Sequence, residues 1–163
     1  MPRSGPIIGV LTVPGIVKEV RITRNFVGEL LEGWPCRDSA VLLTSELVTN
    51  SILHSRSGDG GKVTVVVIDL GTSARVEVID DGSDQTPRTH SGQAHLADDG
   101  RGLRIVEAVA SSWGATGDDH GTTTWFQLDA EPHPEHLPAK SADDDRHART
   151  VTATQIARQN TAP

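Results

Sequence analysis

The sequence has 163 residues, a net charge of −7 and 36% apolar residues, which suits one domain and is too short for two. This acidic balance excludes the basic surface needed to bind a phosphate backbone, so we expect no direct contact with nucleic acid. The single cysteine, Cys36, cannot form an internal disulfide, and no apolar run approaches the roughly 18 residues of a membrane span. We therefore expect a cytoplasmic protein with no part in the membrane.

The first part of the chain predicts a short strand, or an extended lead-in, over 7–13, followed by two helices. Pro14 suits the first turn of the first helix, and Gly33 ends the near-helical spacing of its apolar residues. Asp38 is a good N-cap for the second helix, predicted over 39–55. The apolar residues of this second helix cover a broad face, so it should be largely buried.

The second part of the chain is richer in strands. Two β-branched segments, 62–69 and 74–80, are separated by a short turn and predict an antiparallel hairpin. A polar loop follows over 80–99, and loops of this length tend to be functional. A helix over 102–112 and strands over 113–116 and 122–128 complete the prediction. Because neighbouring strands are joined by short turns, we expect an α/β (α+β) two-layer sandwich with a mixed, mostly antiparallel sheet covered by helices.

The sequence changes character near residue 130, which divides it into a domain over 1–130 and a polar tail over 131–163. The tail holds four prolines, no aromatic residue and few large apolar residues. Such a segment cannot bury enough surface to offset its ordering entropy, so we expect it to be disordered. A short helix around 151–158 is an open alternative.

Three polar residues recur every four positions on the second predicted helix: Glu46, Asn50 and His54. This spacing places them along one face of the helix. A carboxylate among apolar neighbours needs partners or has a chemical role, because burying it unpaired is costly. The alternative is an ordinary polar stripe facing solvent, with His54 favoured simply by its place near the helix C-terminus.

Three glycine- or threonine-rich segments lie at the ends of other predicted elements. Asp80-Asp81-Gly82-Ser83-Asp84 ends a strand, where it is either a ligand-binding turn or an ordinary Asp-Gly turn. Gly100-Arg101-Gly102-Leu103 opens a helix, whose N-terminal N–H groups attract phosphate, although a flexible hinge would look the same. It matches neither the Walker A nor the Rossmann pattern. Gly121-Thr122-Thr123-Thr124-Trp125-Phe126 begins the last strand.

Taken in order, ELVTNSILHS, VIDDGSD, DGRGLRIVEAV and GTTTWFQL resemble the four ATP-binding boxes of the histidine-kinase-like (GHKL) ATPase superfamily. Within it, the chain is similar to the single-domain anti-sigma-factor serine/threonine kinases of actinobacteria, over roughly residues 10–130. The resemblance implies the Bergerat fold, a mixed sheet with helices on one face. It also implies binding of ATP with Mg²⁺.

The resemblance assigns a role to each matched residue. Asn50 corresponds to the Mg²⁺ ligand that bridges the ATP phosphates, and Glu46 to the general base acting on a hydroxyl or water. Such roles suit a hard oxygen ligand and an oriented carboxylate. Asp80 corresponds to the aspartate that accepts a hydrogen bond from the adenine amino group, with Asp81 as the register alternative. Gly82 matches the glycine that follows, whereas Asp84 stands where the family has a second glycine.

The resemblance also assigns roles near the ATP phosphates to residues of the later boxes. Gly100 and Gly102 match the second glycine box, together with Arg101 and Leu103, and the stretch 82–100 becomes an ATP lid. Arg101 or Arg104 could stabilise transferred charge. Thr123 matches the family threonine near the base and phosphates, and Thr122 is its near competitor.

The resemblance finally implies an ATP-dependent protein serine/threonine kinase. Family members of this kind phosphorylate a small anti-anti-sigma partner of the STAS fold and sequester a sigma factor, often as a homodimer. The alternative is a nucleotide-gated module that binds its partner without phosphotransfer. Such a module would keep Asp80, Gly82, Gly100 and Gly102 but would not use Glu46 as a base.

Overall fold

The computed structural model describes residues 5–83, 101–118, 120–129 and 150–152. The elements, in chain order, are β1 (Ile7–Pro14), a 3₁₀ turn η1 (Val17–Glu19), α1 (Val20–Leu30), α2 (Arg37–His54), a second 3₁₀ turn η2 (Arg56–Gly58), β2 (Lys62–Asp69), β3 (Ser73–Asp80), α3 (Arg101–Val109), β4 (Ser112–Asp118), β5 (Gly121–Asp129) and β6 (Thr150–Thr152). This order of helices and strands within residues 7–129 agrees with the sequence prediction.

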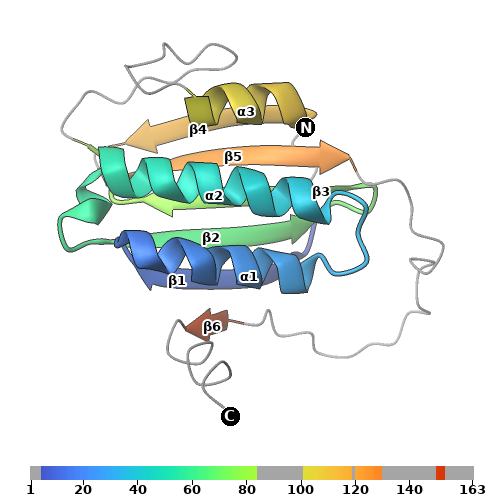
Figure 1. Cartoon of the computed structure of the whole chain (residues 1–163), viewed down its shortest axis with the longest axis horizontal. Coiled ribbons are helices and arrows are strands. Elements are labelled where there is room, and N and C mark those ends of the chain that lie inside the picture. Colours follow the sequence, from blue (N-terminus) through green and yellow to red (C-terminus); the bar gives the residue numbers. More distant parts are fainter. Residues whose placement is uncertain (1–4, 84–100, 119, 130–149, 153–163) are drawn as a thin grey trace.

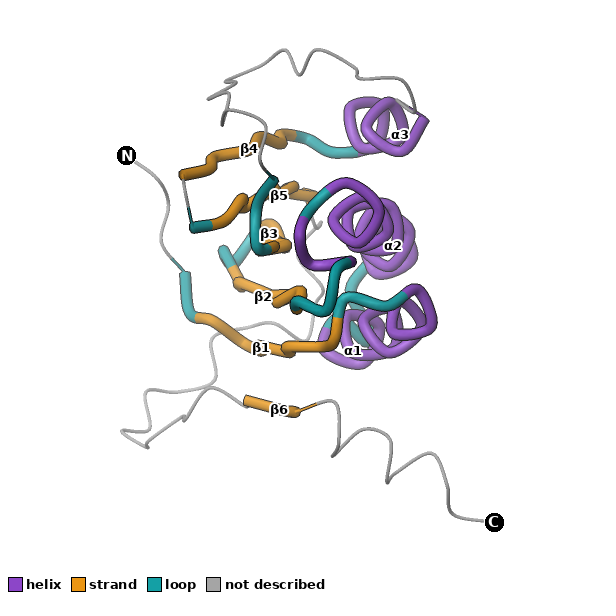
Figure 2. The backbone as a smooth tube through the Cα atoms, turned by 90° about the vertical axis from the view of Figure 1, so that its left-hand side faces the viewer, coloured by secondary structure: helices purple, strands orange, loops and turns teal. Residues whose placement is uncertain are grey.

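The strands form one sheet in the order β4-β5-β3-β2-β1-β6. Every neighbouring pair is antiparallel except β1 and β6, which run parallel, so the sheet is mixed and mostly antiparallel. The three helices lie side by side on one face of the sheet (Figure 1), and the view from the side separates the two layers clearly (Figure 2). The predicted two-layer fold is therefore confirmed.

The core lies between these two layers because the central strands alternate. Val63, Val65 and Val67 of β2 and Val76 and Val78 of β3 are fully buried against the helices. Alternate residues of a strand face opposite sides of the sheet, so the intervening side chains lie on the open face. Phe126 and Leu128 of β5 extend the same buried layer toward α3.

α2 is the central helix and covers the middle of the sheet. Its buried residues recur at helical spacing and include Leu43, Leu47 and Val48. The helix is not buried all round, because Leu42 and Leu53 are 44% and 61% exposed. The prediction of a largely buried helix is therefore correct for one broad face only.

Two predicted helix starts differ from the structure. Pro14 ends β1, where it is paired in register with Lys62, and helical structure begins only at Val17. Asp38 lies in the first turn of α2, whose N-cap is Cys36. Its carboxylate accepts a hydrogen bond from Arg37 at 2.9 Å, and no side chain caps the helix.

The tail was not expected to contribute to the sheet. Residues 150–152 nevertheless form β6, which pairs with β1 in the register Val10 with Thr150 and Thr12 with Thr152. The rest of the predicted tail lies outside the described residues, as does most of the predicted lid. No helix among the described residues is long and apolar enough to cross a membrane.

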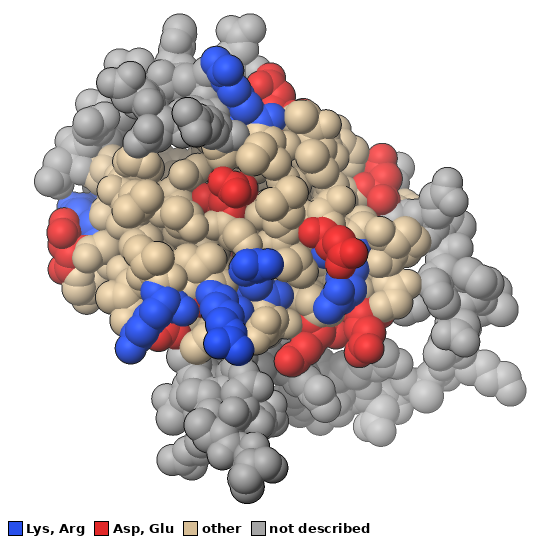
Figure 3. Space-filling view, viewed as in Figure 1, with Lys and Arg blue, Asp and Glu red and all other residues tan. Residues whose placement is uncertain are grey.

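Charge is unevenly distributed over the helix-covered face. Basic side chains gather over the part of this face where α1 lies (Figure 3). Lys18, Arg21 and Arg24 are all exposed there, on η1 and α1. The first half of α1 is therefore basic, although the chain as a whole is acidic.

Candidate functional site

The candidate site begins where α2 meets α3. Glu46 and Asn50 lie one turn apart on α2 and are both half-buried. Both side chains approach Gly102 of α3: a Cβ placed on Gly102 would lie 2.9 Å from Oε2 of Glu46 and 3.1 Å from Nδ2 of Asn50. The predicted pair and the predicted glycine are thus brought together, and the absence of a side chain on Gly102 makes room for the two polar groups.

Asp80, the last residue of β3, presents its carboxylate to the same layer. Its side chain is only 8% exposed and accepts hydrogen bonds from the Gly82 amide at 2.8 Å, from the Ser51 hydroxyl and from the Thr122 amide. Ser51 follows Asn50 directly on α2. Desolvation by burial raises the pKa of Asp80, and the three hydrogen bonds oppose this rise.

Asp81, the register alternative, has a different role. Its Oδ2 accepts a hydrogen bond from the backbone N–H of Lys62 at 2.8 Å, and its own amide donates to the Ser57 hydroxyl at 2.9 Å. These bonds hold the turn to the start of β2. The structure therefore directs Asp80 toward α2 and uses Asp81 to fix the backbone.

Gly82 is needed in this turn because its φ is +72°, a region that other residues rarely adopt. It also lies close to β5, since a Cβ on Gly82 would be 3.3 Å from Cα of Gly121. Gly121 is equally confined: a Cβ there would meet the carbonyl oxygen of Asp80. Two glycines thus allow the end of β3 and the start of β5 to come close beside Asp80.

The threonines of β5 divide between the two faces of the sheet. In the β3–β5 register, Asp80 is opposite Thr122, and Ile79 is opposite Thr123. Directly opposed residues share a face, so Thr123 lies on the open face, away from the helices. The competitor, Thr122, lies on the side of Asp80, as does Thr124 one step along, and the choice of Thr123 as the site residue stays a prediction.

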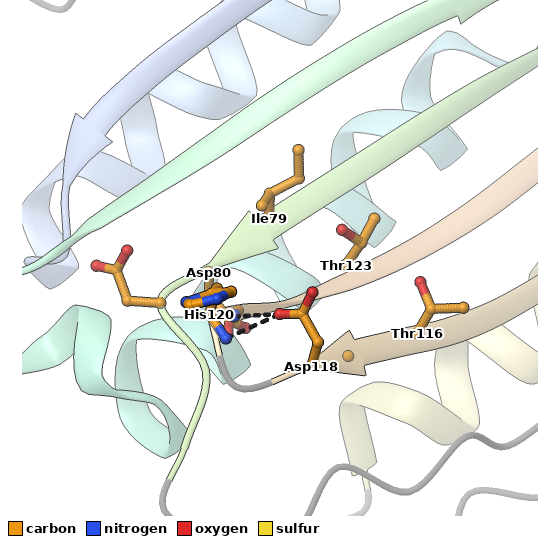
Figure 4. Close-up of a pocket in the computed structure, with 9 residues that line it drawn as sticks. Ile79, Asp80, Thr116, Asp118, His120 and Thr123 are labelled. Carbon is orange, nitrogen blue, oxygen red and sulfur yellow. Dashed lines mark hydrogen bonds between the residues drawn. The ribbon is translucent and has the colours of Figure 1, made fainter.

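The open face has a hollow of its own beside this end of the sheet. It has a volume of about 420 Å³ and is lined by Ile79, Asp80, Asp81, Thr116, Thr123 and residues of the β4–β5 turn. Figure 4 shows Ile79, Thr123 and Thr116 on three neighbouring strands. Asp118 closes the turn by accepting bonds from the amides of His120 and Gly121 at 2.8 and 3.1 Å. This hollow is separate from the pair Glu46 and Asn50.

The remaining predicted residues are placed less directly. Leu103 is half-buried and packs against the hydrophobic core, and Arg104 is exposed on α3. Arg101 begins α3, but only its backbone is described, and Gly100 lies outside the described residues. His54 ends α2, where it is exposed.

The site has the chemistry of a nucleotide site more than that of a dedicated metal centre. Among the described residues, no three His, Cys, Asp or Glu side chains gather around one point. Mg²⁺ is commonly held by one or two protein oxygens together with phosphates and water. The Asn50 side chain has one hard oxygen of this kind, and its amide group borders the space over Gly102. The described residues therefore fit a metal that arrives with a phosphate ligand.

Sequence reasoning missed Ser51, Arg56 and Ser57, which support the site. Ser51 was hidden because a serine next to Asn50 in a helix carries no signal of its own. Its position one residue after Asn50 turns it toward β3, which only the packing of α2 on the sheet reveals.

Residues 14–128 match the family described as Histidine kinase-like ATPase domain, and the chain belongs to this family. Among solved structures it is similar to the RsbU and RsbW domains of Rv1364c from Mycobacterium tuberculosis. The TM-score is 0.53 and the identity 22%, over 74% of this chain and 32% of that one, so the chain spans about a third of that protein's chain. No curated protein sequence matches the chain.

Proposed function

We propose that the chain is an ATP-dependent protein serine/threonine kinase and anti-sigma factor that phosphorylates an anti-anti-sigma partner of the STAS fold. One observation carries the proposal: Glu46 and Asn50 lie one helical turn apart and both border the space over Gly102. A base and a metal ligand at this spacing suit phosphoryl transfer, in which positioning and charge stabilisation do most of the work. Two comparisons support the proposal. The chain belongs to the ATPase family, and its fold is similar to that of a solved structure that contains an RsbW domain.

Each residue of the site has a defined task in this proposal. The carboxylate of Asp80 accepts a hydrogen bond from the adenine amino group, and Gly82 lets the base approach the turn. Asn50 donates its amide oxygen to Mg²⁺, which neutralises phosphate charge when bound. Gly102, the second residue of α3, lies at a helix N-terminus, where backbone N–H groups favour phosphate.

Glu46 is the general base of the proposed transfer. It takes the proton of the partner's serine or threonine hydroxyl. The hydroxyl oxygen bonds to the transferred phosphorus, and the bond between that phosphorus and the leaving ADP breaks. A positioned base of this kind accelerates a reaction by roughly 10²- to 10⁴-fold.

The test is a pair of measurements on the parent chain and on Glu46→Gln. Calorimetry should show ATP binding in the presence of Mg²⁺ for both proteins, with affinities within a few-fold, because the Glu46 carboxylate does not meet the base or ribose. Phosphorylation of a STAS-type partner recovered with the chain from its own cell should fall by about 10²- to 10⁴-fold in the variant. Glu29→Gln is the matched control, since Glu29 is exposed on α1.

Two results would overturn the proposal in different ways. If the parent and Glu46→Gln transfer phosphate equally, Glu46 is not the general base. If neither transfers it, the chain is a nucleotide-gated binding module and not a kinase. If the parent does not bind ATP with or without Mg²⁺, the nucleotide site itself is wrong.

A further inference from the structure

We propose that Arg56, the first residue of η2, is a positioning residue for the nucleotide. It holds the peptide between Asp81 and Gly82, so that Asp80 keeps the orientation in which it can recognise the base. The inference rests on the proposed nucleotide site, and it adds a residue that neither the sequence motifs nor the family match singled out.

Among the described residues, Arg56 makes two hydrogen bonds to the turn that follows Asp80. Its backbone N–H donates to the carbonyl oxygen of Gly82 at 2.7 Å, and its Nε donates to the carbonyl oxygen of Asp81 at 3.1 Å. One guanidinium nitrogen lies 3.4 Å from the point where a Cβ on Gly82 would stand. One residue therefore binds two successive carbonyl groups of the turn that follows Asp80.

Ser57 also holds the turn that follows Asp80 through hydrogen bonds. Its side chain is fully buried, accepts the hydrogen bond from the Asp81 amide at 2.9 Å and donates to the carbonyl oxygen of Lys62 at 2.6 Å. Lys62 in turn donates its amide to the Asp81 carboxylate at 2.8 Å. This closed set of bonds fixes the backbone of Asp81, and Arg56 extends the fixed region to Gly82.

The geometry matters because Gly82 has little intrinsic preference for its conformation. A glycine at φ +72° loses more conformational freedom on folding than other residues do, so the turn needs external support. The amide of Gly82 donates to the Asp80 carboxylate at 2.8 Å. A shift of the Asp81–Gly82 peptide would therefore rotate the donor that orients Asp80.

The arrangement also joins the two halves of the site. Arg56 follows α2 by two residues, and α2 carries Glu46 and Asn50. Ser51 of the same helix bonds to Asp80 directly. The turn that follows Asp80 is thus attached to α2 and the segment after it at two points. Ser51 lies before the end of α2, and Arg56 lies after it.

An arginine beside a nucleotide site could instead bind phosphate, and the two roles predict different results. A phosphate-binding arginine would contribute equally to ATP and GTP, and a lysine would replace much of its effect. A positioning arginine acts through Asp80, whose hydrogen bond is specific for the adenine amino group. Its loss should therefore lower the affinity for ATP and leave the weaker binding of GTP nearly unchanged.

The experiment measures Kd for ATP and for GTP, with Mg²⁺, in the parent, Arg56→Ala and Arg56→Lys. Arg56→Ala should weaken ATP binding about 3- to 10-fold, the scale of one lost hydrogen bond. The ratio of the Kd for GTP to the Kd for ATP should fall by the same factor. Arg56→Lys should resemble Arg56→Ala, because lysine keeps the charge but cannot place a donor at the Nε position. Amide exchange at Gly82 should accelerate in both variants.

Arg37→Ala is a matched control, since Nε of Arg37 also donates to a backbone carbonyl, that of Gly28 at 2.9 Å, but on α1. It should leave both Kd values unchanged even if it lowers the melting temperature. Equal losses for ATP and GTP, or full rescue by Arg56→Lys, would overturn positioning in favour of phosphate binding. Unchanged Kd values in Arg56→Ala would overturn it outright, and a parent that binds no ATP would remove the proposed function together with this inference.

Discussion

Asp80 is a carboxylate that its surroundings make harder to ionise. Burial in the layer between sheet and helices is the largest influence and raises its pKa, and the nearby charge of Asp81 raises it further. Hydrogen bonds from Gly82, Ser51 and Thr122 favour the charged form but do not cancel the effect of burial. Above this raised pKa, the ionised carboxylate of Asp80 is therefore kept at a cost to the stability of the fold.

This cost predicts opposite pH dependences for stability and for binding. Because the folded-state pKa of Asp80 is raised, its contribution to stability is lost as the pH rises through that pKa and regained as the pH falls toward the ordinary aspartate value of about 3.9. The affinity for ATP should instead weaken as the pH falls, because protonated Asp80 no longer accepts the bond. Urea unfolding and ATP titrations at a series of pH values between 7 and 4 measure both.

Asp80→Asn separates this group from the other carboxylates of the chain. The variant should lose the Asp80 part of both pH dependences and should no longer prefer ATP to GTP. In Asp81→Asn the preference for ATP should persist, because the Asp81 carboxylate bonds to the backbone of Lys62. An unchanged preference in Asp80→Asn and a lost one in Asp81→Asn would reverse the assignment.

The sequence alone could predict which face of the sheet some site residues lie on, but not others. Asp80 continues the buried alternation of Val76 and Val78, so the strand pattern alone already places it on the helix side. The same argument cannot choose within Thr122-Thr123-Thr124, because three identical residues have no pattern. Only the register against β3 shows which of them share the face of Asp80.

The approach of α3 to α2 depends on the missing side chain of Gly102. A methyl group there would lie 2.9 Å from Oε2 of Glu46, which is the far end of a flexible side chain and can move aside. Alanine is also favoured over glycine within a helix by about 1 kcal/mol. The Gly102→Ala variant should therefore melt at the same or a slightly higher temperature. Its Mg²⁺-dependent ATP binding should be weaker by at least about 5-fold, roughly 1 kcal/mol, because Glu46 and Asn50 are displaced.

Gly28→Ala on α1 is the matched control for this variant. A Cβ on Gly28 would also meet a flexible side-chain end, the Arg37 guanidinium at 3.2 Å, but this contact is not part of the site. Thermal melting and calorimetry of the two variants should agree in stability and differ in ATP affinity. A Gly102→Ala protein that binds ATP like the parent would show that the space over Gly102 is not used.

Elements were predicted best where the periodic signal was long. α2 and the β2–β3 hairpin lie within two residues of their predicted bounds because their apolar residues repeat over many positions. The start of α1 was misplaced because Pro14 suits a first helical turn and the end of an outer strand equally well. Its register pairing with Lys62 decides for the strand.

At the scale of the whole molecule, the sheet has a nearly uncovered outer strand. β1 carries no charged residue over Ile7–Pro14, and among the described residues its outer side is paired at Val10, Leu11 and Thr12 by β6. Outer strands usually carry a charge or other device that prevents pairing with a second molecule. β6 could not be predicted, because three residues in a polar tail carry no periodic signal and their partner lies far away in the sequence.

Removal of residues 131–163 should therefore change association more than binding. ATP affinity should stay within about 2-fold of the parent, a factor near 0.4 kcal/mol, since β2 and β1 separate β6 from β3, which carries Asp80. The shortened chain should self-associate more strongly with concentration than the parent, as measured by analytical ultracentrifugation. Adding Thr12→Lys should suppress this association by placing a charge on the exposed edge.

Thr64→Lys in the shortened chain is the control, because Thr64 is the cross-strand partner of Thr12 and shares its 2.9 Å hydroxyl contact, but lies on the inner strand β2. It should not suppress association. Equal sedimentation of the full and shortened chains at all concentrations would show that β6 does not shield β1.

The pairing of β1 with β6 also sets an order of events during synthesis. Val10 and Thr150 are partners in the sheet although 140 positions separate them, as the difference of their numbers shows. At about 5–20 residues per second, a ribosome makes the first roughly 7–28 s before the second. The domain is complete only when Asp129 at the end of β5 has been made, 21 residues and about 1–4 s before Thr150, and its first strand lacks β6 during this shorter interval. Any chaperone, nascent neighbour or protease that reads a bare strand edge has that interval in which to act.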